Sequence, residues 1–177
     1  MMPSAAAEKK NILIYILLLI TVSAVAVTLW ALFFRGTDGY LVPDYAPAAQ
    51  EQNARPIPDD HESGLDAQPG SGSVSLTYSN ELSIDLSSGK MDLLFANPGR
   101  SNQDVVLQIL IQDKVIHQTG RITPGNQVTQ LKLSVASLGM LREGGYEGSF
   151  CVYYYDRTSG EKAMVNTQMP IFVTVTK

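Results

Sequence analysis

An uncharged, apolar segment near the N-terminus, residues 12–34, constrains this chain more than any other feature of its sequence. Twenty of its 23 side chains are hydrophobic, and the only polar ones are Thr21, Ser23 and Thr28. As an α-helix the segment would measure roughly 34 Å, which is enough to cross the hydrocarbon core of a bilayer. We therefore predict a single transmembrane helix over residues 12–34, with the lipid bilayer as its surroundings.

The charges on either side of this segment predict its orientation. Basic residues precede it, whereas a long acidic stretch follows it. Because positive charge is retained in the cytoplasm, residues 1–11 are expected inside the cell and the C-terminal domain outside. The aromatic and basic side chains expected at the two membrane interfaces are Lys9, Lys10, Tyr15, Trp30 and Arg35.

A cleaved signal peptide is the alternative interpretation, with the small residues 24–26 as its cleavage site. The apolar core of a signal peptide is typically about 7–15 residues long. The apolar segment here has 23 residues, so its length favours an uncleaved signal-anchor. The expected localisation is thus the cell membrane, with a single pass.

Residues 36–73 differ abruptly in composition from what precedes them. They contain five prolines, five glycines, seven acidic residues and one arginine, with almost no aliphatic periodicity. Such a stretch has too little apolar surface to offset the entropy cost of ordering it, so we predict a disordered, acidic linker. His61 and the acidic residues beside it are interpreted as solvated charge and not as a metal site.

Beyond the predicted linker, residues 74–177 show hydrophobic residues with a period of two. In one run Leu82, Ile84 and Leu86 alternate with polar residues, and similar runs are separated by turns rich in Gly, Pro, Asn and Asp. This pattern is typical of an antiparallel β-sandwich. The predicted fold class is therefore all-β, with seven to eight strands in one extracytoplasmic domain.

The segment 138–146 carries a more specific likeness. It reads leucine, a charged turn, two glycines and then Tyr146, which opens a long strand. This arrangement resembles the late corner of immunoglobulin-like and fibronectin-type sandwiches, and the resemblance implies that the Tyr146 hydroxyl caps the backbone of the preceding loop. The cysteine pair and the packed tryptophan of antibody domains are absent. The resemblance is therefore to a generic surface sandwich, as in bacteria or archaea, and not to a specific family.

Composition and motifs exclude several classes of function. A net charge of −4 is not that of a nucleic-acid binder, and a single cysteine, Cys151, is not that of a disulfide scaffold. His117, the only histidine after residue 73, is expected on the outer face of a strand, and Cys151 is expected to be a small buried hydrophobe. No residue set provides a nucleophile, base and orienting group. We therefore expect no enzymatic activity, no cofactor and no metal.

A role in binding remains, and paired tyrosines are its candidate surface. Alternation places Tyr153 and Tyr155 on one face of a strand and Tyr154 on the core side. The pair is predicted to bind a protein partner if exposed; the alternative is that both pack beneath a neighbouring loop. We expect an interaction or structural module, an accessory subunit of a cell-surface or secretion assembly. A carbohydrate-binding or peptidoglycan-binding module, with cell-wall polysaccharide as ligand, is the alternative, and an enzyme is disfavoured.

Overall fold

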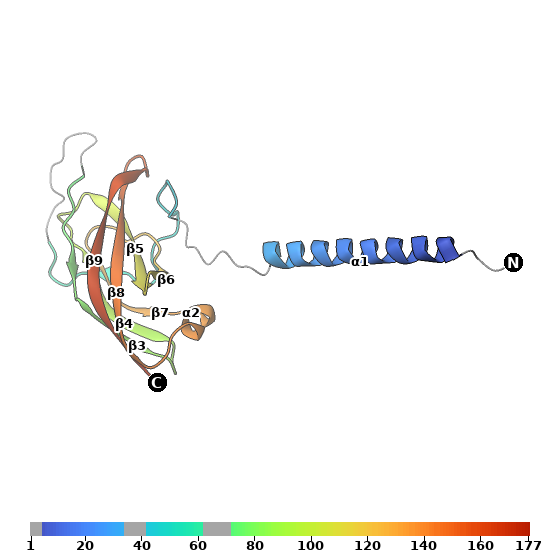
Figure 1. Cartoon of the computed structure of the whole chain (residues 1–177). Coiled ribbons are helices and arrows are strands. Elements are labelled where there is room, and N and C mark those ends of the chain that lie inside the picture. Colours follow the sequence, from blue (N-terminus) through green and yellow to red (C-terminus); the bar gives the residue numbers. More distant parts are fainter. Residues whose placement is uncertain (1–4, 34–41, 62–71) are drawn as a thin grey trace. The chain divides into compact units, whose positions relative to one another are not determined.

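The computed structural model describes residues 5–33, 42–61 and 72–177, with the side chains of residues 5–13 and 30–33 excepted. The chain divides into two compact units, Met1–Asp38 and Gly39–Lys177. The first contains helix α1 (Ala5–Phe33), drawn in blue in Figure 1. The predicted helix is therefore confirmed as a helix, and it begins earlier than expected. Within the described part of the chain, no helix has both the length and the apolarity that crossing a membrane requires.

The second unit is built almost entirely of strands. Its elements are β1 (Arg55–Pro56), β2 (Thr77–Tyr78), β3 (Glu81–Asp85), β4 (Lys90–Asn97), β5 (Gln103–Ile111), β6 (Lys114–Gln118), β7 (Asn126–Lys132), α2 (Val135–Gly139), β8 (Gly144–Asp156) and β9 (Lys162–Thr176). The all-β prediction is confirmed for this unit, and every strand expected from period-two alternation is present. The two-residue strands β1 and β2 and the five-residue helix α2 were not predicted.

The strands form one continuous, curled sheet in the order β1-β7-β4-β3-β9-β8-β5-β6, with β2 also paired to β4. All neighbouring strands are antiparallel except β3 and β9, which run parallel. The prediction of a purely antiparallel sandwich is therefore wrong at this pair. Alternation specifies which face of a strand is buried but not the direction of its neighbours, and here the last part of the 15-residue β9 pairs with β3 while almost its whole length pairs with β8.

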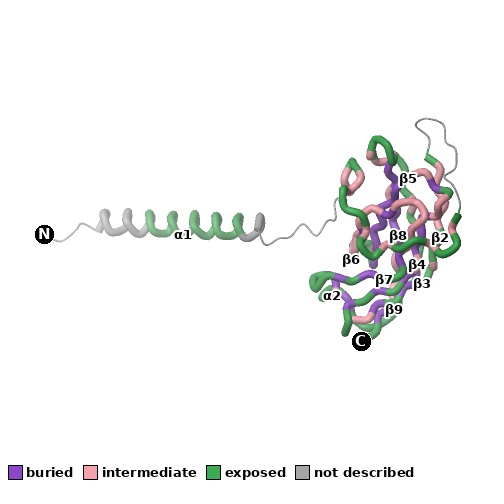
Figure 2. Tube along the Cα trace, turned by 180° about the vertical axis from the view of Figure 1, so that it is seen from behind, coloured by how far each residue is buried: buried purple, intermediate pink, exposed green. Residues whose placement is uncertain are grey.

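Hydrophobic side chains form one core cluster within the sheet. Figure 2 colours the buried stretches of the strands purple. Alternation along β9 places Ile171, Val173 and Val175 in this core, each no more than 5% exposed. Two phenylalanines from opposite parts of the sheet meet there, since the rings of Phe95 and Phe150 contact edge to face with centroids 6.0 Å apart. This contact joins β4 to β8 across the core.

The tyrosine corner implied by the immunoglobulin-like resemblance is present. The Tyr146 hydroxyl donates to the Arg142 carbonyl oxygen at 2.9 Å and accepts from the Arg142 backbone N–H at 3.2 Å. One side chain therefore satisfies both backbone groups of Arg142 in the loop between α2 and β8. This loop sets where β8 begins, because the tyrosine is the third residue of that strand.

Residues 42–61, which we call the strap, correct the linker prediction. Three strap amides donate to the domain: Ala46 to the Gly160 carbonyl, Glu51 to that of Arg121, and Ile57 to that of Gly125, at 2.7–2.9 Å. β1 lies within the strap and pairs with β7. The prediction of a disordered linker is therefore wrong for residues 42–61, while residues 36–41 and 62–71 of that linker lie outside the described residues.

The strap is held by polar contacts, which is why a hydrophobicity argument missed it. The Glu51 carboxylate accepts from the backbone N–H of Gly120 at 2.8 Å. A Cβ on Gly120 would stand only 2.9–3.1 Å from backbone atoms of the strap, so glycine is what permits this approach. The prolines of the strap further lower its conformational entropy in the unfolded chain, which reduces the entropy lost on docking.

Hydrogen exchange will test the docked strap. In the full chain, the amides of Ala46, Glu51 and Ile57 should exchange more than about tenfold more slowly than unstructured amides, since each is hydrogen-bonded to the domain. The substitution Gly120→Ala should abolish this protection by displacing the strap. Gly139→Ala is the matched control, since a Cβ there meets nothing within 4 Å. Rapid exchange of all three amides in the unmodified chain would refute the docked strap.

Removing the hydroxyl of the tyrosine corner should destabilise the domain. Tyr146→Phe deletes two hydrogen bonds to Arg142, so we expect the free energy of unfolding to fall by about 1 kcal/mol. Chemical denaturation of the full chain measures this change. Tyr45→Phe serves as control, because the Tyr45 side chain is 61% exposed and should cost no more than a few tenths of a kcal/mol. Equal losses in the two variants would argue against a stabilising corner.

Candidate binding surface

The tyrosine pair proposed from the sequence does not form an open surface. Tyr153 and Tyr155 do share the outer face of β8, but Tyr155 is fully buried and Tyr153 is partly buried. The Tyr155 hydroxyl donates to the carbonyl oxygen of Pro43 in the strap at 2.9 Å. Burial raises the pKa of Tyr153 to about 12. Exposure of the pair was thus predicted wrongly, and the alternative, packing beneath a neighbouring segment, describes Tyr155.

The remaining sequence-predicted residues of β8 lie as expected. Tyr154 is 8% exposed on the core side, and its hydroxyl donates to Thr167 Oγ1 at 2.6 Å. Cys151 is a buried free thiol. Its Sγ donates to the Tyr153 hydroxyl oxygen at 3.3 Å, so it forms part of the packing beside the strap.

His117 lies in β6, half-covered near the strap. Burial lowers its pKa, and the negative charge of Glu51 partly opposes this shift. The imidazole is therefore held toward its neutral form next to a carboxylate whose role is to anchor the strap.

The residues predicted for the membrane interfaces fall mostly outside the described side chains. Tyr15 is 71% exposed on α1. Lys9, Lys10 and Trp30 belong to α1, but their side chains are not among those described, and Arg35 lies outside the described residues. The interface assignment of these five residues therefore stays a prediction.

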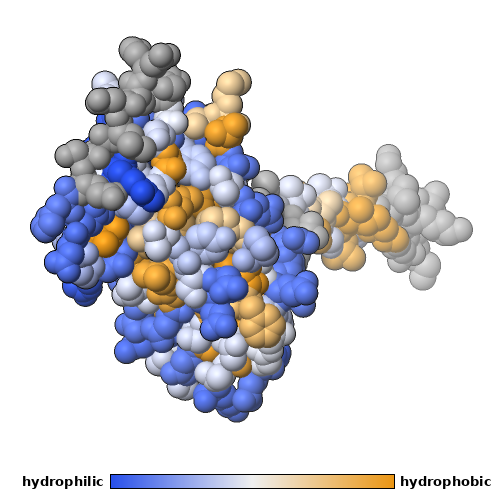
Figure 3. Space-filling view, turned by 90° about the vertical axis from the view of Figure 1, so that its left-hand side faces the viewer, coloured by the Kyte–Doolittle hydropathy of each residue, from blue (hydrophilic) through white to orange (hydrophobic). Residues whose placement is uncertain are grey.

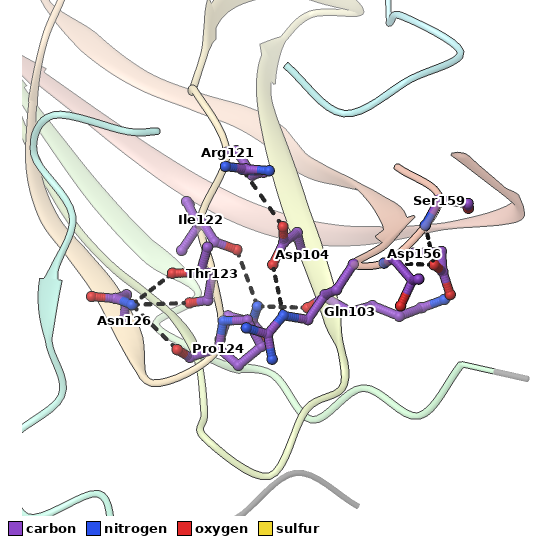
Figure 4. Close-up of polar contacts among 12 residues, drawn as sticks. Gln103, Asp104, Arg121, Ile122, Thr123, Pro124, Asn126, Asp156 and Ser159 are labelled. Atoms are coloured by element: carbon purple, nitrogen blue, oxygen red, sulfur yellow. Dashed lines mark hydrogen bonds and ion pairs between the residues drawn. The ribbon is translucent and has the colours of Figure 1, made fainter. Parts of the chain in front are cut away.

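A buried charge cluster joins three segments at one end of the domain. Asp104 at the beginning of β5 is 3% exposed and pairs with Arg121, as Figure 4 shows, and also with Arg157. Its Oδ2 is 3.5 Å from Arg121 Nε, and its Oδ1 is 3.6 Å from Arg157 Nε. Both distances exceed those of good charge-assisted hydrogen bonds, and neither Asp104 Oδ1 nor Arg121 Nε has a hydrogen bond within the described residues.

Electrostatics indicate that this cluster is structural. Burial raises the pKa of Asp104 above its ordinary value, and the two arginines only partly offset that effect. Beside it, the buried Asn97 side chain donates to the carbonyl oxygens of Gln103 and Ile122 at 3.0 and 3.1 Å. These contacts hold the ends of β4 and β5 to the crossover that leads into β7.

The outer face of β3, β9 and β8 carries the surface best suited to binding. Its centre is Phe172 on β9, which is 54% exposed on a face that also carries the exposed Pro170 and polar residues such as Gln168 and Thr174. In the strand register, Phe172 stands opposite Glu81 of β3 on one side and Glu147 of β8 on the other. Directly opposite side chains on neighbouring strands lie within about 5.5 Å of each other at Cβ. We call Glu81, Phe172 and Glu147 the acidic-aromatic row.

The tip of the Phe172 ring reaches toward a glycine of β8. A Cβ on Gly145 would be 2.9 Å from Phe172 Cζ and 3.6–3.7 Å from the two Cε atoms. A side chain at position 145 would therefore displace the end of the ring. More than half of the Phe172 side chain remains open to solvent.

Two shallow depressions extend on either side of the row. One, of about 730 Å³, is lined by Glu147 together with Gln112, Asp113, Ser149 and Gln168. The other, of about 520 Å³, is lined by Phe172 and Glu81 together with Ser79, Ser83 and Asp92. Figure 3 shows a face of the molecule on which hydrophobic side chains lie in small separate patches among hydrophilic ones.

The wall of the larger depression contains strained backbone. Gln112 and Asp113 form the turn between β5 and β6, and both have positive φ, 51° and 62°. Two consecutive positive φ angles are typical of a type I′ hairpin turn, which usually contains asparagine or glycine. The turn thus presents two long polar side chains where smaller residues are the usual choice.

The outward position of Phe172 can be predicted from the sequence. Placing Met169, Ile171 and Val173 on the core side of the last strand requires Phe172 to point outward. A large aromatic residue at a position that alternation assigns to solvent is an informative exception. The flanking glutamates were not predictable, because strand register depends on which strands are neighbours.

Comparison with known proteins adds little. No family model matches the chain, and no curated protein matches it. Among solved structures, it is similar to AggA, the major subunit of aggregative adherence fimbriae type I from Escherichia coli. Sequence identity is 13%, over 66% of this chain and 100% of that chain, with a TM-score of 0.29. A TM-score this low does not establish a shared fold.

The buried Asp104 should make stability depend on pH. Because burial raises its pKa above 3.8, the folded state binds this proton more tightly than the unfolded state. The contribution of protonated Asp104 to stability is fully present below pH 3.8, the ordinary pKa of the group. It is lost as the pH rises through the raised pKa of the folded state. Asp104→Asn should lack this component, so the stability of the unmodified chain relative to that variant should fall with rising pH.

Denaturation at several pH values measures the difference. Asp113→Asn is the control, since Asp113 is exposed and asparagine tolerates its positive φ. A constant difference between the unmodified chain and Asp104→Asn across the acidic range would contradict the assignment of a raised pKa.

Proposed function

We propose that this chain is a membrane-anchored, extracytoplasmic interaction module, an accessory subunit of a cell-surface or secretion assembly. It contacts its protein partner through the acidic-aromatic row on the outer face of β3, β9 and β8. The single observation that carries the proposal is the exposed ring of Phe172 at the centre of a polar sheet face. Exposed aromatic side chains supply much of the binding energy of protein interfaces because they offer a large area with few rotatable bonds.

A purely structural role does not account for the whole row. Phe172 covers Gly145, which is a sufficient reason for some large side chain at that position. That role does not call for glutamates on both neighbouring strands, since carboxylates beside an apolar ring add no packing. Covering the ring would remove apolar surface worth up to about 1.5–3 kcal/mol from water, which a partner gains on binding.

The membrane anchor in this proposal is supported by the sequence of residues 12–34, which has 23 residues without a charge. The orientation, with the domain outside, is supported by the basic residues that precede this segment. The immunoglobulin-like assignment is part of the same proposal, and the capped corner at Tyr146 supports it. Catalysis is not part of the proposal.

A second candidate function is carbohydrate binding, favoured by the larger depression. Gln112, Asp113, Ser149 and Gln168 offer the amide, carboxylate and hydroxyl groups that bind sugar hydroxyls. In that case the exposed ring of Phe172 would stack on a sugar face. Retention of the full chain on purified cell-wall polysaccharide, lost on Gln168→Ala, would favour this alternative.

Photo-crosslinking tests the protein-binding role in cells of the source organism. With benzoylphenylalanine in place of Phe172, we expect a discrete protein adduct of the full chain. The matched control carries the same group at Thr129, an exposed position on β7, and should give no such adduct. Equal labelling from both positions, or none from position 172 in a chain that reaches the membrane, would refute the proposed surface.

A further inference from the structure

We infer that the acidic-aromatic row binds a basic segment of the partner protein, with an arginine or lysine side chain seated on the Phe172 ring between Glu81 and Glu147. This inference rests on the proposed function and specifies the chemistry of its partner. It follows from three features of the row: the register that places the residues together, the accessible part of the ring, and the carboxylates that line the face.

The register supplies a fixed geometry. Glu81 and Glu147 are the direct neighbours of Phe172 in the strand register, one on each side of it. They lie in β3 and β8, the two strands that are hydrogen-bonded on either side of β9. The spacing of the two carboxylates is therefore set by the sheet and does not depend on a loop.

The Phe172 ring is supported at its tip and is otherwise accessible. The tip reaches toward Gly145 of β8, and the side chain is 54% exposed, so part of the ring is open to a ligand. A cation above an aromatic face is attracted by the ring quadrupole, and arginine adds planar stacking to that attraction. The two glutamates can then accept hydrogen bonds from the same guanidinium or ammonium group.

Among the described residues that line the two depressions there are carboxylates and no lysine or arginine. The ion pairs of Asp104 with Arg121 and Arg157, and of Asp44 with Lys162, involve residues outside these linings. Neither glutamate of the row takes part in one. Asp113 and Asp92 add further carboxylates in the depressions on either side. A positively charged partner is therefore the complementary one.

The extent of the face favours a peptide segment over an isolated cation. The two depressions continue the row across the sheet in both directions, with polar side chains that can bond a backbone. A saccharide would stack on the ring but would gain nothing from two ionised glutamates. The dependence of binding on the charge of the two glutamates therefore distinguishes a basic peptide from a saccharide.

Binding of a short fluorescein-labelled peptide of alternating arginine and glycine to the full chain, in detergent at physiological ionic strength, tests the inference. Its counterpart, with neutral citrulline in place of arginine, should not bind. Glu81→Gln and Glu147→Gln should each weaken binding about three- to tenfold. Glu161→Gln, which removes an exposed glutamate outside the row, should leave the affinity unchanged.

Two substitutions of the ring separate its π face from its bulk. Phe172→Leu keeps an apolar side chain over Gly145 but should weaken binding by about threefold or more. Phe172→Tyr keeps the aromatic face and should bind like the unmodified chain. Equal weakening by Glu161→Gln and Glu147→Gln, no effect of Phe172→Leu, or no binding of the arginine peptide would each overturn the inference.

Failure here is distinguishable from failure of the proposed function. If the crosslink from position 172 to a protein persists while the arginine peptide does not bind, the surface is correct and the basic partner is wrong. If polysaccharide binds and the glutamate variants leave its affinity unchanged, the saccharide alternative replaces the basic segment. Loss of the crosslink itself refutes the surface as a whole.

Discussion

The pairing of β8 with β9 is the interaction on which the rest of the domain depends. These are the two longest strands, with 13 and 15 residues, and they are hydrogen-bonded along almost their whole length. β9 continues the sheet to β3, and β8 continues it to β5, so every other strand is attached through this hairpin. The core is formed by one side of the pair. The strap and the acidic-aromatic row both lie on its other side, where Tyr155 and Phe172 point outward.

Period-two alternation predicted the larger strands of the domain because each has one face in the core. Leu82 and Ile84 of β3 are buried while Glu81 and Ser83 are exposed, as a half-buried strand requires. The same reasoning placed Tyr153 and Tyr155 on the outer face correctly but took that face to be open. The error about the tyrosines and the error about the linker have one cause. The strap covers Tyr155, and it is held by backbone hydrogen bonds, which cannot be predicted from the pattern of hydrophobic residues in the sequence.

Only part of the candidate surface could be predicted from the sequence. The outward position of Phe172 follows from the inward positions of Ile171 and Val173. Its neighbours do not follow, since Glu81 lies far from it in the sequence and meets it through the parallel pairing of β3 with β9. Local patterns specify the face of a strand, whereas the composition of a surface depends on long-range register.

The parallel pairing of β3 with β9 also bears on the order in which the chain folds. Thr176 donates to the carbonyl oxygen of Ile84, 92 residues earlier in the sequence. A chain synthesised from its N-terminus therefore carries β3 without its neighbour until β9 has been made. Contacts of such high sequence separation slow folding, because the entropy of closing the intervening chain is lost before the contacts form. Until β9 is available, the edge of β3 that it covers stays unpaired, and an open strand edge of this kind is a template for pairing with other chains.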